Sequence, residues 1–166
     1  MSEVIYNYFT TPLGEIELAV SNDELIACSF FDIKGKVRNK QTTSESALFN
    51  ETKKQLNAYF NSDLQNFNLP LNFIGTDFQK KVWTQLSTIN FGKTTSYLQM
   101  AKNLGDPKCI RAAASANGKN PFAIIVPCHR VIGTNGSLTG YAGDLWRKEW
   151  LLNHEQKNKQ VLLQYD

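Results

Sequence analysis

The chain has 166 residues and a mass of 18.8 kDa, the size of one ordinary domain or two small ones, which excludes a large multidomain assembly. Hydrophobic residues make up 42% and charged residues 20% of the chain, so it can bury a core and is not an extended disordered tail. The longest apolar run, residues 122–126, is far too short to cross a bilayer, and the first ten residues lack the pattern of a signal peptide. Three scattered cysteines do not form a disulfide framework, which favours a reducing compartment.

Charge is distributed unevenly along the sequence. Residues 1–75 contain 6 basic and 9 acidic residues, whereas residues 76–166 contain 12 basic and 6 acidic ones. No acidic residue occurs from Pro107 to Gly143. The second half is therefore the expected partner of a polyanion, although a modestly basic surface is common and does not establish nucleic-acid binding by itself.

The acidic half predicts a small antiparallel sheet and one helix. Alternating apolar residues separated by turn signals predict three strands, at 4–9, 15–20 and 25–31. Near-helical spacing of apolar residues predicts a helix over about 45–60. Alternation returns at 67–73, which predicts a last short strand that Pro70 confines to a sheet edge.

Gly75 marks the predicted boundary between two domains, residues 1–75 and 76–166, because the apolar period then changes from 2 to about 3.6. Thr76 and Gln79 form a capping box that opens the first helix of the second domain. A second helix is expected from about Ser96 to Gly105.

The rest of the second half predicts a helix-turn-helix and a final helix. Asp106 as N-cap and Pro107 at the first helical position open a helix that runs to Gly118, closely following the previous one. An apolar strand is expected at 122–126 and a glycine-rich loop at 133–143. The final helix, from about Asp144, is expected to direct Leu145, Trp146, Trp150 and Leu151 inward. The predicted fold class is α/β, a small sheet domain followed by a mainly helical one.

Cys128 is the strongest candidate for a reactive residue. Most free cysteines are buried and inert, and we interpret Cys28, within a strand pattern, as core. Cys109, in the first turn of a helix, requires no function either. Cys128 instead follows Pro127 directly, beside a histidine and an arginine in the most basic stretch. Because a cysteine nucleophile needs a nearby base and a cationic field, this context favours Cys128.

His129 is the candidate base for Cys128. Neighbours on a strand point to opposite faces, so proton transfer between the two residues requires a bridging water. Glu149 and Glu155 in the final helix are both candidates to orient His129, and the pattern does not choose between them. The histidines and cysteines show no spacing typical of zinc ligands, so we expect no metal site.

Arg111 is followed by a run of small side chains, residues 112–116. Such a run permits close backbone approach, either to another helix or to the minor groove of DNA, and the sequence leaves both interpretations open. In the second case Arg111 would enter the base stack.

These residues together resemble a known family. Residues 127–130, preceded by Asn120-Pro121 and Ser96-Tyr97 and followed by the segment 148–155, are similar to the O6-alkylguanine-DNA alkyltransferases over roughly residues 76–156. The first half resembles the family's N-terminal domain, described as ribonuclease-H-like.

The resemblance implies roles for individual residues. Cys128 accepts the alkyl group in one turnover, and His129 and a water relay its proton to Glu155, which is thereby selected over Glu149. Tyr97 serves the flipped guanine and the DNA phosphate, and Arg111 fills the space that the base leaves. The resemblance further implies that Asn120 is a hinge, that Val131 and Cys128 offer carbonyls to the guanine amino group, that Tyr141 and Ala142 close the pocket, and that Asp106 and Thr134 contact the DNA backbone.

The chain departs from some members of the family, and two alternative functions remain, a sequence-specific DNA-binding regulator and a cysteine hydrolase. Residues 1–75 contain Cys28 but no histidine, so the zinc site of some relatives is expected to be absent. We expect no cofactor, a monomer in the cytoplasm, and double-stranded DNA with alkylated guanine or thymine as partner. A sequence-specific regulator would need base-reading residues where residues 112–116 are small. A cysteine hydrolase rarely places Cys and His next to each other.

Overall fold

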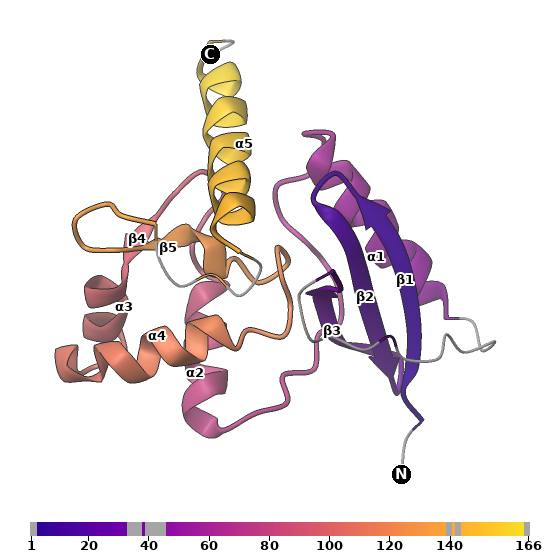
Figure 1. Cartoon of the computed structure of the whole chain (residues 1–166), viewed down its shortest axis with the longest axis horizontal. Helices are drawn as coiled ribbons and strands as arrows, with labels where there is room; N and C mark the ends of the chain where they lie inside the picture. The colour runs from indigo at the N-terminus through magenta and orange to yellow at the C-terminus, as the bar shows by residue number, and fades with distance from the viewer. Residues whose placement is uncertain (1–2, 33–37, 39–45, 139–140, 142–143, 165–166) are drawn as a thin grey trace. The chain divides into compact units, whose positions relative to one another are not determined.

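The computed structural model describes residues 3–32, 38, 46–138, 141 and 144–164, with side chains up to residue 157 (Figure 1). Contacts divide the chain into two compact units. The first unit runs to Ile74 and includes Pro121–Ile125, and the second comprises Gly75–Asn120 and the chain from Val126 onward. The division into two domains at residue 75 stays a prediction, and the short return of residues 121–125 to the first unit was not expected.

The first unit contains an antiparallel meander and one helix, as predicted (Figure 1). Its strands are β1 (Ile5–Thr11), β2 (Gly14–Ser21) and β3 (Glu24–Phe30), paired in the order β1-β2-β3. Asn22 and Asp23 both adopt positive φ in the tight turn between β2 and β3, the conformation that suits a two-residue hairpin. Helix α1 (Ala47–Phe60) begins after Ser46, whose side chain accepts from the Leu48 N–H at 3.2 Å.

The predicted edge strand at 67–73 is wrong. Only a bridge between Leu25 and Leu71 forms, with Leu25 N–H donating to the Pro70 carbonyl at 2.8 Å. A helix side chain takes the place of a strand partner, because the Gln55 amide both donates to and accepts from the Asn68 backbone at 2.9 Å. Gln55 therefore satisfies backbone groups that a ladder would otherwise pair.

The predicted strand at 122–126 is also wrong. Phe122 makes one bridge to Cys28, and the chain then turns, with Ile125 N–H donating to the Ala123 carbonyl at 2.7 Å. Ile124 lies at φ +70°, a conformation that a β-branched residue rarely adopts, so the turn is strained. The run is apolar because it is buried, not because it pairs in a sheet. Cys28 is fully buried, which confirms its interpretation as core.

The second unit is mainly helical. It contains α2 (Asp77–Leu86), α3 (Tyr97–Asn103), α4 (Ile110–Gly118) and α5 (Leu145–Gln164), with a short parallel pairing of β4 (Thr95–Ser96) and β5 (Val131–Ile132). The capping box at Thr76 and Gln79 is formed in both directions. The Trp83 indole donates to the Ala116 carbonyl at 2.9 Å and ties α2 to α4. The third predicted helix opens with a 3-10 turn, η1 (Pro107–Cys109), before α4 begins.

The inward face of α5 differs from the prediction. Leu151 is buried as expected, but Leu145 and Trp146 are 48% and 53% exposed. Arg147 and Lys148 are buried in their place, at 2% and 0% exposed. A hydrophobicity pattern assigns charged residues to the surface and therefore misses a helix that buries two cations. No helix among the described residues is both long and apolar enough to cross a membrane.

Candidate active site

Cys128 begins the 3-10 turn η2 (Cys128–Arg130), not the end of a strand, and is 5% exposed. The turn is held at its start by Asn120, whose amide donates to the Val126 carbonyl at 2.8 Å. Burial raises the pKa of the Cys128 thiol, while a hydrogen bond from Asn120 and the positive charge of Lys148 act to lower it. The sulfur is therefore shielded from water, but the Asn120 side chain and the Cys128 backbone donate to it and the charge of Lys148 acts on it.

His129 and Glu155 form a buried pair. His129 Nε2 lies 2.7 Å from Glu155 Oε2, and the side chains are 0% and 1% exposed. Burial lowers the pKa of His129 despite the nearby carboxylate, so the imidazole is neutral at neutral pH. Because the Nε2–H group of the neutral imidazole donates a hydrogen bond to Glu155, Nδ1 carries a lone pair. Among the described residues this Nδ1 has no hydrogen-bond partner, so it is available to a water or a substrate proton.

Arg130 fixes the carboxylate of Glu155. Its Nε donates to Oε1 at 2.8 Å and its Nη2 donates to Oε2 at 3.1 Å, while Nη1 donates to the Ile89 carbonyl at 2.6 Å. The backbone N–H of Gly92 donates to Oε1 at 3.3 Å. Burial alone would raise the pKa of Glu155, but His129 and Arg130 outweigh it and hold the pKa well below its usual range. Glu149 is exposed and does not join this network.

Lys148 and Tyr97 form a second pair of buried residues in the same unit. The parallel pairing of Thr95 with Val131 brings the start of α3, where Tyr97 is buried, beside β5. Lys148 Nζ donates to the Val131 carbonyl at 2.5 Å and lies 5.6 Å from the centroid of the Tyr97 ring. Lys148 begins the segment 148–155 that carries the family resemblance, but the sequence assigns it no role.

Asn117 is a second residue that the sequence analysis missed. It is 1% exposed on α4, and its Nδ2 lies 3.5 Å from the Cys128 carbonyl oxygen. Its Oδ1 is buried without a hydrogen-bond partner among the described residues. An asparagine in a run of alanines is the only sequence signal for this position, and a polar residue there is equally typical of a helix end.

The remaining predicted residues lie at exposed or half-buried positions. Asp106 caps η1, accepting from the Lys108 N–H at 2.9 Å, and Arg111 is exposed on α4. Thr134 is exposed and Tyr141 half-buried, while Ala142 lies outside the described residues. Among the described residues, no hydrogen bond joins Asp106, Arg111 or Thr134 to the buried network around Glu155. These three assignments stay predictions.

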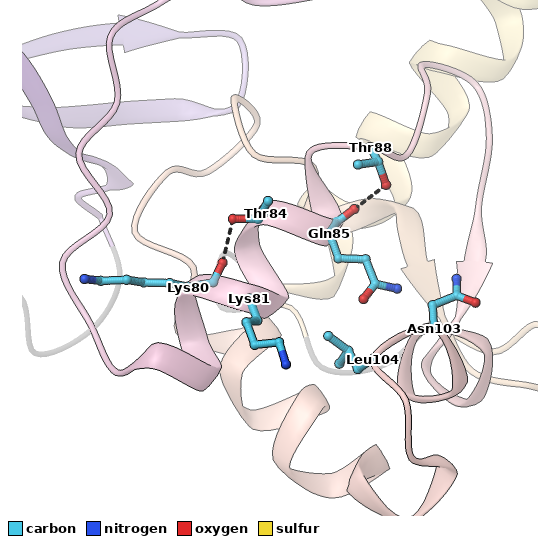
Figure 2. Close-up of a pocket in the computed structure, with 7 residues that line it drawn as sticks. All are labelled: Lys80, Lys81, Thr84, Gln85, Thr88, Asn103 and Leu104. Carbon is cyan, nitrogen blue, oxygen red and sulfur yellow. Dashed lines mark hydrogen bonds between the residues drawn. The ribbon is translucent and has the colours of Figure 1, made fainter.

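A separate groove lies between α2 and α3 (Figure 2). Two of its threonines are engaged locally, since Thr84 donates to the Lys80 carbonyl at 2.8 Å and Thr88 donates to the Gln85 carbonyl at 2.6 Å. None of the predicted site residues lines it. The groove is lined by Lys80, Lys81, Thr84, Gln85, Thr88, Asn103 and Leu104.

Comparison with known families covers both units of the chain. Residues 4–73 match the family described as "6-O-methylguanine DNA methyltransferase, ribonuclease-like domain", and residues 77–157 match its "DNA binding domain". The chain belongs to this family. The resemblance expected from Cys128 and its surroundings is thereby confirmed, and so is the mixed α/β fold class.

Curated members of the family cover nearly the whole chain. The methylated-DNA–protein-cysteine methyltransferase of Methanosarcina acetivorans is 46% identical over 151 residues, covering 90% of this chain and 97% of the relative. The constitutive enzyme of Bacillus subtilis is 42% identical, covering 90% and 96%. The crystal structure of the Mycobacterium tuberculosis O6-methylguanine methyltransferase is 41% identical with a TM-score of 0.84 and covers 94% of each chain. The crystal structure of Mycobacterium tuberculosis OGT in complex with DNA is 42% identical, with a TM-score of 0.84, and covers 92% of this chain and 93% of that chain.

Proposed function

We propose that the chain is a methylated-DNA–protein-cysteine methyltransferase that moves an alkyl group from O6 of guanine, and from O4 of thymine, in double-stranded DNA to Cys128. Family membership supports this activity. The observation that carries the choice of residues is the buried series Cys128, His129, Glu155, in which the 2.7 Å contact leaves His129 Nδ1 open to accept a proton. The proposal includes a monomer that acts in the cytoplasm without a cofactor or metal.

The first step is formation of the thiolate. The Cys128 proton passes through a bridging water to His129 Nδ1, and the imidazolium that results is stabilised by Glu155. The neutral state of His129 before the step supports this direction of transfer, because only the neutral imidazole accepts a proton. Asn120 stabilises the thiolate by its hydrogen bond to the sulfur.

The second step is displacement at the alkyl carbon. The sulfur of Cys128 forms the new S–C bond while the C–O6 bond breaks, and the electron pair of that bond stays on the guanine. Tyr97 donates a hydrogen bond or a proton to the departing base. The carbonyls of Cys128 and Val131 accept from the guanine amino group, and Tyr141 and Ala142 close the pocket. The alkyl group at the base-pairing edge is reached only after the base leaves the duplex.

The product explains why one molecule repairs one lesion. A thioether is not activated toward water, and we identify no second nucleophile that would remove the alkyl group. Repair should therefore stop when the number of lesions removed equals the number of protein molecules. Titration of methylated duplex with known amounts of protein tests this stoichiometry. Continued turnover on the methylated duplex would contradict the single-turnover mechanism, and multiple turnover on an ester or peptide would favour the cysteine hydrolase instead.

The DNA-binding part of the proposal involves α3 and α4. We infer that they act as a helix-turn-helix, that Arg111 fills the space left by the flipped base, and that Asp106 and Thr134 contact the DNA backbone. The exposed cation of Arg111 supports contact with a polyanion. The small exposed side chains beside it on α4 support a close approach to the DNA.

Replacing Arg111 by alanine tests whether its side chain fills the space left by the flipped base. We expect Arg111→Ala to slow transfer from methylated duplex by roughly tenfold, since unstacking a base costs a few kcal/mol that an inserted side chain offsets. Transfer from the free alkylated base requires no unstacking and should be unchanged. Lys119→Ala, an exposed cation just after α4, is the matched control in single-turnover rate measurements. Equal losses on duplex and free base would contradict the proposed insertion.

A further inference from the structure

Lys148 is a buried charged group that has no part in the proposed mechanism. Its side chain is 0% exposed, although lysine is among the residues least often buried without a partner. Burial lowers its pKa to about 8, so the ammonium form still predominates at neutral pH. A cation kept out of water at this cost is typical of a site where the charge is used.

The ammonium of Lys148 connects two parts of the proposed site. It donates to the Val131 carbonyl at 2.5 Å, and its charge acts on the sulfur of Cys128. The ionisable groups facing it are Cys128 and His129 from η2 and Tyr97 from α3. The Cys128 thiolate favours the charged form of Lys148 in turn, so the two groups stabilise each other's ionised state.

Both carbonyls assigned to base recognition already have a side-chain donor. Lys148 occupies one lone pair of the Val131 oxygen, and Asn117 Nδ2 lies 3.5 Å from the Cys128 oxygen. A carbonyl oxygen has two lone pairs, so the Val131 oxygen retains one acceptor position for the exocyclic amino group of guanine, whereas the Cys128 oxygen also accepts from the backbone N–H of Val131. The hydrogen bond from Lys148 fixes the orientation of the Val131 peptide, and therefore the direction in which the remaining acceptor position of its oxygen points.

We propose that Lys148 is a positioning residue that holds the Val131 carbonyl for the amino group of the flipped guanine and stabilises the Cys128 thiolate. This inference rests on the proposed function. Alkylated thymine has no such amino group, so the hydrogen bond to the Val131 carbonyl favours alkylated guanine over alkylated thymine. It requires the charge and the donor of Lys148, not merely its volume.

The test compares Lys148→Met with Lys157→Met, a matched change at an exposed lysine on the same helix. Single-turnover rates are measured on duplexes containing O6-methylguanine or O6-methylhypoxanthine, which differ only in the amino group. We expect the guanine-to-hypoxanthine rate ratio to fall roughly fivefold in Lys148→Met, the scale of the one neutral hydrogen bond between the guanine amino group and the Val131 carbonyl. The ratio in Lys157→Met should match that of the unmodified protein. An equal loss on both duplexes would overturn the recognition role.

A second readout does not depend on DNA. Carboxamidomethylation of Cys128 by iodoacetamide, mapped to its peptide and followed as a function of pH, reports the thiol pKa. Loss of the Lys148 charge should shift this profile to higher pH, and Lys148→Arg should restore it. An unshifted profile would overturn the electrostatic role. If the unmodified protein shows the profile but transfers no methyl from either duplex, it is the proposed function that fails.

The unmodified protein provides the same test without a substitution. Lys148 loses its charge above about pH 8, so the guanine-to-hypoxanthine ratio should decline as the pH rises through that value. A ratio that stays constant through this range would contradict the recognition role even if every Lys148 variant failed to fold.

Discussion

Cys128→Ala is expected to abolish alkyl transfer while leaving binding to lesion-containing duplex roughly unchanged. The substitution removes the only atom that forms the new bond, whereas the exposed surface of α4 that is assigned to DNA is untouched. Cys128 is buried, at 5% exposed, but the substitution removes a single sulfur atom, so the cavity is small and costs little stability. Transfer is measured as methyl bound to protein, and binding as retention of a methylated duplex.

Cys109→Ala is the matched control, since Cys109 is the other cysteine of the second unit and is only half-buried. Its thiol lies 3.8 Å from the Ala101 carbonyl and contacts none of the proposed site residues by hydrogen bond. The control should transfer at the rate of the unmodified protein. Methyl transfer that persists in Cys128→Ala and is lost in Cys109→Ala would reassign the nucleophile.

Glu155→Gln is expected to lower both stability and thiol reactivity. The substitution keeps the volume but leaves the buried Arg130 guanidinium without its carboxylate, which costs about 3 kcal/mol of unfolding free energy. It also removes the charge that stabilises the His129 imidazolium, so the thiolate forms less readily. Denaturant unfolding and Cys128 alkylation rates measure the two effects. Glu149→Gln, an exposed change on the same helix, should alter neither.

The same network predicts how stability depends on pH. The pKa values of Glu155 and His129 both lie below their ordinary values, so each group contributes stability above its unfolded pKa and loses it as the pH falls toward the folded one. Unfolding free energy should therefore decline on acidification, first below about pH 6.5 through His129 and then below about pH 4.3 through Glu155. Glu155→Gln should lack the second decline. An identical acid profile in the variant would remove Glu155 from the ion pair.

Most elements follow from local sequence signals, and the exceptions have specific causes. The hairpins, α1 and the Thr76 capping box depend on residues within a few positions of one another, so periodicity and turn chemistry predict them. Residues 122–126 resemble a buried strand because a run of apolar residues does not reveal whether its backbone pairs. The positive φ of Ile124 leaves no such signal in the sequence.

In the candidate site, too, some residues follow from the local sequence and others depend on tertiary packing. Cys128 and His129 are neighbours in the sequence, but the choice of Glu155 over Glu149 came from the family resemblance, and the contact with His129 depends on how α5 packs. The burial of Lys148 could not be predicted, because it is set by contacts with Val131 and Tyr97 that lie far from it in the sequence. Tertiary contacts of this kind override the rule that lysine lies on the surface.

The intact mass of the protein after reaction with an excess of O6-methylguanine duplex tests the account most directly. We predict that the whole population gains the mass of one methyl group, that peptide sequencing places it on Cys128, and that no further lesion is then repaired. Protein recovered at its original mass after many lesions have disappeared, or a methyl group mapped to Cys28 or Cys109, would contradict it.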